Sequence, residues 1–512
     1  DADLKSGRVS ARDIRADALN LLLRANLDAD NIHKDDAPIS GSLIFKAPKL
    51  DQLFKSLGQP LLADVIASLS IEADVAGNSE EVSLAPFSLK AGVGGPLLGT
   101  AQEILEVSAA RAVGNLDSER VKVEGLSLTG LGLALSGEFE ASDLLEAPKA
   151  KGELYLPAFD LRALAERLKI ALPEMADNTT LKKVGVSTRF AATQKSLELE
   201  ALALTLDETS LTGELEVADF DAQDTRFELA LDRIDLDRYM PPAPEKGDAQ
   251  KGAAPATPET AAAAAAELPV EMLRALKVSG DLTAGELKAS NITLRNLEVA
   301  LRARDGLIRI DPASADLYEG RYSGKVTLDA TGEVPALAIK SNLSGVQVRP
   351  LLSDLADQRM LGGTASVDMD LTAVGAAVPD LEKTLNGTVK MAVTEGTIRG
   401  LTAFAKFGQR IGSVTDLVGT DSAQAAGEQK KELYFTGLSA TAVAKDGVIT
   451  NDDFTLEAPL LRATGSGTLA NLPAKTLDYA TEVTVVATLS GEGGTSLSDL
   501  TGLPVPVLNQ FK

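Results

Sequence analysis

Few residue types in this chain could carry out chemistry, and none of them stands in a recognisable catalytic pattern. The 512 residues include a single histidine, His33, and no cysteine, which excludes multi-histidine metal sites, thiolate ligands and cysteine nucleophiles. The run Asn451-Asp452-Asp453 offers oxygen ligands for calcium, but it lacks the spacing and the glycine of an EF-hand loop. Gly92, Gly94 and Gly95 lie in a turn-rich loop without a phosphate-binding motif. We therefore assign no catalytic or metal-binding residue.

The amino-acid composition argues against several classes of binding partner and of enzyme. The formal charge of −24 and the pI of about 4.6 lack the basic footprint of a nucleic-acid-binding protein. Tryptophan is absent, and 13 Phe and 6 Tyr leave few flat faces for stacking sugars or bases. The 74 acidic residues include many carboxylate pairs of the kind that glycosidases use, but nothing distinguishes one pair. We predict a protein without enzymatic activity or cofactor that does not bind nucleic acid.

The sequence pattern predicts that most of the secondary structure consists of β-strands. Period-two apolar residues recur along its length, and each run places its apolar residues on one face and polar residues on the other. One phrase, apolar-x-apolar-x-x-Leu/Tyr, predicts a strand that runs into a helical turn. Its copies are Phe159/Leu161/Leu164, Ile234/Leu236/Tyr239 and Val346/Val348/Leu351, with Leu50/Leu53 as a partial copy.

A second phrase places glycine between small polar and apolar residues inside a predicted strand. Glycine in a strand often marks a bulge or a bend. The glycines of this phrase are Gly137, Gly213, Gly324 and Gly465.

Residues 241–267 are rich in Pro, Ala, Lys, Glu and Gly and too poor in large apolar side chains to form a core, which predicts a linker or insertion. It separates an N-terminal β-rich segment, residues 1–240, from a C-terminal β-rich region, residues 268–512. A short helix with Val270, Leu273 and Leu276 on one side opens the second region. Further helical stretches are expected at residues 51–69, 101–107, 159–170, 350–357 and 401–417, most of them capping sheet ends.

The strands after residue 290 form a predicted antiparallel meander. Arg295-Asn296 is expected to separate two strands, and Asp305-Gly306, a strong hairpin dipeptide, to join the second strand to a third. No run approaches the roughly 20 apolar residues of a membrane-spanning helix, and the chain begins with Asp1. We therefore expect a processed or trimmed piece.

The order of motifs in the second half resembles the C-terminal region of the AsmA family. The matching segments run from the helix at Leu268-Pro269 through Asp305-Gly306 and Leu317-Tyr318-Glu319-Gly320 to Glu395-Gly396-Thr397 and Leu503-Pro504-Val505-Pro506. The resemblance is looser over residues 1–240. It implies a periplasmic β-rich body with an apolar groove, anchored to the inner membrane by an N-terminal helix that this chain lacks.

The predicted fold is mainly β, a long curved antiparallel β-sheet that forms an elongated apolar groove, with short capping helices. The expected function is a periplasmic bridge that binds phospholipid acyl chains and moves phospholipid between the inner and outer membranes, with an outer-membrane or periplasmic protein as partner. The alternative is a non-catalytic envelope scaffold that assists assembly of outer-membrane proteins through exposed strand edges. The groove candidates are Leu202, Leu204, Leu211, Leu215, Leu229, Leu287, Ile292, Leu294, Leu297, Val299, Leu301, Leu307 and Ile310.

Overall fold

The structure is a computed structural model that describes most of the chain. The described residues are 2–3, 7–18, 21–33, 36–50, 66–94, 103–115, 117–242, 268–399, 432–459, 461–472 and 476–485. The chain divides into two compact units, unit 1 with Asp1–Ile234 and Arg238–Ala243, and unit 2 with Asp235–Asp237 and Pro244–Lys512. The linker predicted at residues 241–267 and the helix predicted at 401–417 fall almost wholly outside the described residues, as does most of the helix predicted at 51–69.

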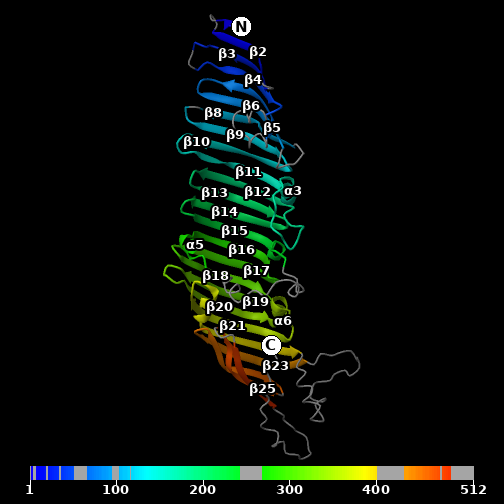
Figure 1. The fold of residues 1–512 in the computed structure, drawn as a ribbon, viewed down its shortest axis with the longest axis vertical. Helices are drawn as coiled ribbons and strands as arrows, with labels where there is room; N and C mark the ends of the chain where they lie inside the picture. Colours follow the sequence, from blue (N-terminus) through cyan, green and yellow to red (C-terminus); the bar gives the residue numbers. More distant parts are fainter. Residues whose placement is uncertain are drawn as a thin grey trace, which may run out of the picture. The chain divides into compact units, whose positions relative to one another are not determined.

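Unit 1 is an antiparallel meander in which successive strands lie side by side in chain order (Figure 1). Its strands are β1 Ala2–Asp3, β2 Arg8–Ala18, β3 Leu21–Ala29, β4 Ile39–Ala47, β5 Ile66–Gly77, β6 Glu81–Val93, β7 Glu103–Ala109, β8 Arg111–Asn115, β9 Arg120–Gly130, β10 Leu133–Ser142, β11 Lys149–Phe159, β12 Val184–Thr193, β13 Leu197–Leu206, β14 Thr209–Asp219 and β15 Asp224–Asp235. The consecutive strands β7 and β8 share one place in the sheet, because both pair with β6 and with β9.

Unit 2 repeats the same architecture. Its strands are β16 Lys277–Ala289, β17 Ile292–Arg304, β18 Leu307–Leu317, β19 Gly320–Asp329, β20 Ala336–Gln347, β21 Leu361–Val374, β22 Asn386–Arg399, β23 Glu432–Lys445, β24 Val448–Ala458, β25 Leu461–Asn471 and β26 Thr476–Val485. Each strand pairs antiparallel with the next strand in the chain. The prediction of a mainly β fold of antiparallel strands is confirmed.

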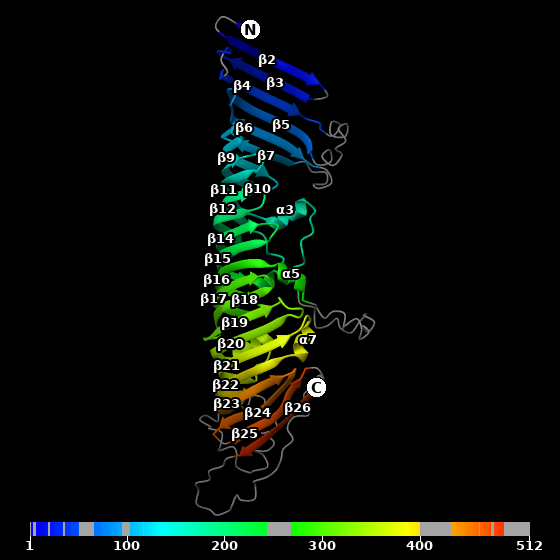
Figure 2. The same cartoon turned by 90° about the vertical axis from the view of Figure 1, so that its left-hand side faces the viewer.

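The helices are short and lie between strands. They are α3 Leu161–Arg167, the 3-10 turn η2 Leu236–Arg238, α5 Val270–Ala275, α6 Val348–Ala356 and α7 Val378–Lys383. All three full copies of the first sequence phrase are strands that run directly into a helical turn, at α3, η2 and α6, as predicted. Figure 2 shows α5 and α7 at one side of the unit 2 strands, and the amide of Leu268 before α5 donates to the carbonyl of Ala376 before α7 at 2.7 Å. Among the described residues, no helix is long and apolar enough to span a bilayer.

Two local predictions are wrong. Residues 101–107 were expected to be helical, but Glu103–Ala109 is the strand β7, whose Leu105 and Val107 pair with Ala91 and Leu89 of β6. A short apolar run fits either period, and pairing with the neighbouring strands decides between them. Arg295-Asn296 does not separate two strands.

Asn296 and Leu297 instead form a bulge opposite Ala315 inside the single strand β17. Asn296 has a φ of 47°, and the pairing of β17 with β18 shifts by one residue between Arg295 and Glu298. The predicted hairpin at Asp305-Gly306 is confirmed, with positive φ at both residues and Arg304 paired with Leu307. Both dipeptides tolerate left-handed backbone, so only the neighbouring strand distinguishes a turn from a bulge.

An ion-pair network fixes the chain after α3 in unit 1. The Arg238 guanidinium donates to Asp177 Oδ2 and to Glu208 Oε2, both at 2.8 Å. Asp177 also accepts bonds from the Thr179 hydroxyl at 2.6 Å and from its amide at 2.7 Å. These Thr179 bonds, together with Arg238, lower the pKa of Asp177 from 3.8 to about 2.

Because this pKa is depressed in the folded protein, the stabilisation by Asp177 is fully present above about pH 4 and is lost as the pH falls toward 2. We expect Asp177→Asn to lower the free energy of unfolding at pH 7, and the difference from the native protein to shrink below about pH 4. Urea denaturation across this pH range measures the difference. Glu174→Gln, at an exposed position, is the control; an equal, pH-independent loss in both variants would contradict the assignment.

Candidate functional site

The candidate site is the apolar face of each sheet. Directly paired residues on neighbouring antiparallel strands share a face, so the register sorts every side chain to one side or the other. In unit 1, Leu204, Leu211 and Leu231 pair in succession across β13, β14 and β15. In unit 2, Leu282 pairs with Val299, and Val299 pairs with Ala313. Apolar residues therefore meet apolar residues strand after strand.

Most large side chains on this face are only partly buried. Leu202, Leu204, Leu297, Val299 and Leu301 all keep intermediate exposure. Many of the buried apolar positions in the strands are alanines: Ala25, Ala47, Ala73, Ala91, Ala109, Ala284, Ala303, Ala315, Ala365, Ala373, Ala444 and Ala463. A continuous apolar face whose large side chains stay accessible is typical of a binding surface.

In the described part of unit 2, helix α6 packs on this face. Helix α6 lies against β17, β20 and β21, and its Val348 joins a buried cluster with Val393, Phe435 and Leu456. Leu352, one turn along α6, packs against the same cluster. Asp354 of α6 accepts a bond of 2.7 Å from the Tyr318 hydroxyl, and burial together with this bond raises the pKa of Tyr318 to about 12. Tyr318 therefore keeps its proton at neutral pH and holds the helix in place.

The structure brings nearly all of the groove candidates onto the apolar faces. In unit 1, Leu202 and Leu229 both pair with Gly213, while Leu211 and Leu215 alternate with it along β14. In unit 2, Leu294 and Leu297 are three residues apart and would lie on opposite faces of a regular strand. The β17 bulge adds one residue, so both are half-buried on one face, whereas Arg295 and Asn296 are exposed. Leu287 and Leu294 pair, as do Ala289 and Ile292.

Leu307 lies on the opposite face. It pairs with Arg304 of β17 and with Asp329 of β19, whereas Ile308 pairs with Ala303 and Leu328. The tight turn at Asp305-Gly306 makes Arg304 and Leu307 the first pair of the hairpin. This pairing decides which side chains of β18 lie on the apolar face and which lie on the opposite face. Ile308 therefore occupies the apolar position that we assigned to Leu307.

Most residues on the apolar face of the remaining strands were not among the groove candidates. The same period-two pattern of apolar residues identifies them. Examples are Leu23, Phe45, Ile71, Leu89, Leu128, Phe139, Leu156 and Val186 in unit 1 and Val326, Ile339, Leu371, Val389 and Val393 in unit 2.

The other face carries charge. Cross-strand ion pairs join Arg189 to Glu200 and Arg226 to Glu216, each at 3.2 Å, and Lys340 to Asp370 at 2.7 Å. Both partners of these pairs are about half exposed, so each contributes little to stability. The pairs keep this face hydrated, which leaves the apolar face as the one that can accept apolar ligands.

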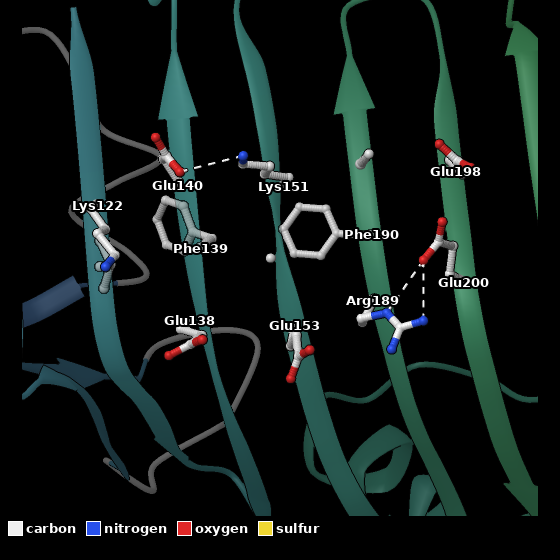
Figure 3. A pocket seen from close by; sticks show the side chains of 13 residues that line it. Lys122, Glu138, Phe139, Glu140, Lys151, Glu153, Arg189, Phe190, Glu198 and Glu200 are labelled. Carbon is white, nitrogen blue, oxygen red and sulfur yellow. Dashed lines mark hydrogen bonds and ion pairs between the residues drawn. The ribbon is translucent and has the colours of Figure 1, made fainter.

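A hollow of about 390 Å³ in unit 1 is lined by charged residues together with Phe139 and Phe190 (Figure 3). Gly152 lies between the two phenylalanines and pairs with both of them. Two of the carboxylates that line the hollow pair with cations: Glu140 is 3.6 Å from Lys151, and Glu200 lies beside Arg189. The hollow is open to solvent and contains no histidine, so its geometry gives no reason to assign it catalysis.

The glycine phrase marks the partners of bulges. Gly213 pairs with Leu202, the first residue after the β13 bulge, and Gly465 pairs with Phe454, the first residue after the β24 bulge. Gly137 and Gly324 pair in the same way with Leu126 and Ala313. A β-carbon at residue 213 would lie 1.9 Å from the Glu228 carbonyl oxygen, so no side chain fits there. These glycines therefore mark the positions of bulges, as predicted. The extra residue of each bulge lies in the preceding strand and not in the strand that contains the glycine.

The acidic run considered for calcium forms the β24 bulge. Asp453 Oδ1 accepts bonds of 2.7 Å from the Thr441 amide and from Asn451 Nδ2. Asn451 is 2% exposed, and its Oδ1 accepts from the Tyr479 hydroxyl at 2.6 Å and from the Phe454 amide at 3.2 Å. Within the described ranges, no cluster of three or more His, Cys, Asp or Glu side chains is placed to hold a metal ion.

The comparisons with known proteins identify the family. The AsmA family profile matches residues 62–454. The chain belongs to the AsmA family. It is 24% identical over 403 residues to Protein AsmA of Escherichia coli (strain K12), an alignment that covers 76% of this chain and 61% of that protein. The chain thus spans less than two thirds of this relative. AsmA family proteins are envelope proteins, so membership indicates an envelope-related function.

Removing the side chain of Asn451 is expected to destabilise unit 2. Asn451→Ala leaves the Tyr479 hydroxyl and the Phe454 amide without their acceptor, at a cost of about 2 kcal/mol in the free energy of unfolding. Chemical denaturation measures it, with Asp452→Asn, at an exposed position in the same bulge, as the control. Equal stabilities of the two variants would show that the amide is dispensable.

Gly152 allows the sheet to close between the two phenylalanines. A β-carbon there would lie 2.1 Å from the Glu138 carbonyl oxygen and 2.7 Å from Phe139 Cα. We expect Gly152→Ala to lower the free energy of unfolding by about 2 kcal/mol or more, since backbone must move. Gly114→Ala is the matched control in β8, because nothing lies within 4 Å of its β-carbon position. The expectation fails if thermal denaturation finds both variants as stable as the native protein.

Proposed function

We propose that this chain is the periplasmic part of a lipid-transfer bridge in a Gram-negative envelope. It binds the acyl chains of phospholipids on its apolar faces and moves phospholipid between the inner and outer membranes. The observation that carries the proposal is the in-register apolar face, whose large side chains remain partly accessible along both units. The activity is non-catalytic and needs no cofactor.

The energetics of such a face suit acyl chains. A chain of about fifteen methylenes gains roughly 12 kcal/mol on full burial, at about 0.8 kcal/mol for each methylene. Neighbouring strands are about 4.8 Å apart, so the apolar rows offer many positions of similar chemistry within a unit. A lipid can move between such positions without a large barrier, and its head group stays at the hydrated edge.

The net negative charge of the chain supports lipid delivery through partner proteins. A formal charge of −24 repels anionic lipid surfaces, so contact with a membrane is made through an anchoring segment or a partner protein. We propose attachment to the inner membrane on one side and an outer-membrane or periplasmic protein as the acceptor. An envelope scaffold that docks outer-membrane proteins is the competing function, and it requires no bound lipid.

The test is a pair of double variants that differ only in the face they change. Leu204→Asp with Leu231→Asp places two charges in one apolar row, whereas Ala203→Asp with Ala230→Asp places them in the adjacent row, which faces the other side. Ala203 and Ala230 are both exposed and both pair with Thr212. The two proteins therefore carry the same added charge on the same strands.

We expect native mass spectrometry to find phospholipid on the native protein and on the Ala203/Ala230 variant, and at least a tenfold loss on the Leu204/Leu231 variant, because each buried carboxylate is costly. Circular dichroism confirms that both variants are folded. Lipid retained equally by both variants, or absent from the native protein, would transfer our support to the envelope scaffold.

A further inference from the structure

The connection between β11 and β12 is long for a meander whose strands are mostly joined by tight turns. Residues 160–183 form it, and α3 occupies only Leu161–Arg167 of them. A connection of more than about 15 residues inside a compact domain is uncommon and is often functional. Arg162 Nε donates to the carbonyl of Thr180 at 3.2 Å, and Thr180 is fully buried. The two limbs of the connection are therefore joined at its base.

The first limb, which contains α3, reaches back along the edge of the sheet to β7. Arg167 Nη1 lies 3.3 Å from Glu103 Oε1 and 3.4 Å from Oε2. Glu103 is the first residue of β7 and lies 64 positions earlier in the sequence. The same Nη1 would lie 4.0 Å from a β-carbon at Gly132, in the turn between β9 and β10. The end of α3 therefore passes the ends of β10 and β9 to reach β7.

The position of Glu103 in the register shows on which side of the sheet this limb lies. Glu103 pairs with Val93, and two residues further along β7 Leu105 pairs with Ala91, so all four side chains share the apolar face. Figure 2 shows α3 to one side of the unit 1 strands. Arg167 thus binds a carboxylate at the end of an apolar row, and α3 lies on the side of the apolar face.

The exposure of the α3 side chains agrees with this position. Leu161, Leu164 and Leu168 recur at helical spacing and are half-buried, and Ala165 between them is 4% exposed. Arg167 and its charged neighbours are exposed. The helix therefore turns an apolar side toward the protein and a charged side toward water.

The second limb is attached beyond the end of β15. The amide of Ala176 donates to the carbonyl of Met240 at 2.8 Å, and the amide of Asp177 donates to the carbonyl of Arg238 at 3.1 Å. The Arg238 guanidinium also donates to Asp177 Oδ2 at 2.8 Å. Because β7 begins and β15 ends at the same edge of the antiparallel sheet, the attachments of both limbs lie along one rim of the apolar face.

The two attachments differ in strength. The side chains of Arg167 and Glu103 are 49% and 30% exposed, and an ion pair this close to water contributes little to stability. The attachment at Arg238 combines an ion pair with two backbone hydrogen bonds. Segments with few buried contacts open locally at a much lower free energy than the sheet that carries them. Opening therefore begins at Glu103, while the contacts at Arg238 hold.

We propose that residues 163–179 form a strap along one rim of the apolar face of unit 1, and that the strap opens at the Arg167–Glu103 pair to let a phospholipid enter or leave. This assignment rests on the proposed lipid-binding function. The closed strap keeps acyl chains on the face, and the open strap gives them a sideways route to a donor or an acceptor. Movement of the strap then limits the rate of lipid exchange in unit 1.

The absence of cysteine allows two introduced thiols to lock the strap. Glu103→Cys with Arg167→Cys is crosslinked by a bis-maleimide whose spacer contains a disulfide. Leu204, in an apolar row of unit 1, is replaced by p-benzoyl-phenylalanine, so that ultraviolet light captures only phosphatidylglycerol bound there. We expect the crosslink to slow the loss of this lipid to acceptor vesicles at least about tenfold, and reduction of the spacer to restore the rate.

The matched control is a second crosslinked ion pair in the same unit. Arg189→Cys with Glu200→Cys joins two residues that already pair across β12 and β13 on the charged face, and we expect it to leave the rate unchanged. Single variants test the opposite direction without a crosslink. Arg167→Gln is expected to speed the loss of lipid about threefold, the scale of an exposed ion pair, whereas Arg189→Gln has no effect.

The other outcomes are equally specific. Equal rates with the Glu103–Arg167 spacer intact and reduced, in a protein shown to be folded by circular dichroism, overturn the strap and leave the proposed function intact. Equal slowing by the crosslink between residues 189 and 200 also overturns the strap, because that crosslink does not touch it. Absence of bound phospholipid from the native protein overturns the proposed function itself.

Discussion

Antiparallel register decides which side chains lie on the apolar face of each unit. In each unit, a residue shares its face with the residue directly across the ladder, so a slip of one position would turn a whole apolar row toward the charged side. The rows Leu204-Leu211-Leu231 and Leu282-Val299-Ala313 persist because every intervening turn and bulge preserves that parity. The apolar face therefore depends on the pairing of whole strands and not on any single residue.

A bulge changes which residues of two neighbouring strands share a face. After the bulges of β9, β13, β18 and β24, the next strand places a glycine opposite the first residue after the bulge, as at Gly213 and Gly465. Opposite the bulges of β2, β17 and β20, that position is taken by Ala25, Ser314 and Ala365. The polar residues of the bulge are satisfied locally, as Asp453 is by the Thr441 amide. The acidic run that was considered for calcium therefore has a structural explanation.

The sequence was a good guide wherever the decisive interactions are local. The period-two runs, the strand-to-helix phrase and the Asp305-Gly306 hairpin all depend on residues that are close along the chain, and each was predicted correctly. The strand β7, the bulge at Asn296 and the face of Leu307 depend on which strand lies beside them, and all three were misjudged. The hydrogen bond from Arg349 to Thr397 could not be predicted, because the two residues are 48 positions apart in the sequence.

Within each unit, strands contact mainly their neighbours in chain order. The exceptions are β7 and β8, which both pair with β6 and with β9, and the places where helices such as α6 and α7 meet the strands. Such a chain behaves as a one-dimensional array, in which each element depends on the two beside it. A pair of strands inserted at a turn would keep every later side chain on its original face, whereas a single strand would reverse the direction of all that follow. The architecture therefore permits growth by hairpins, and the length over which a ligand is sheltered can change in evolution without redesign of the existing rows.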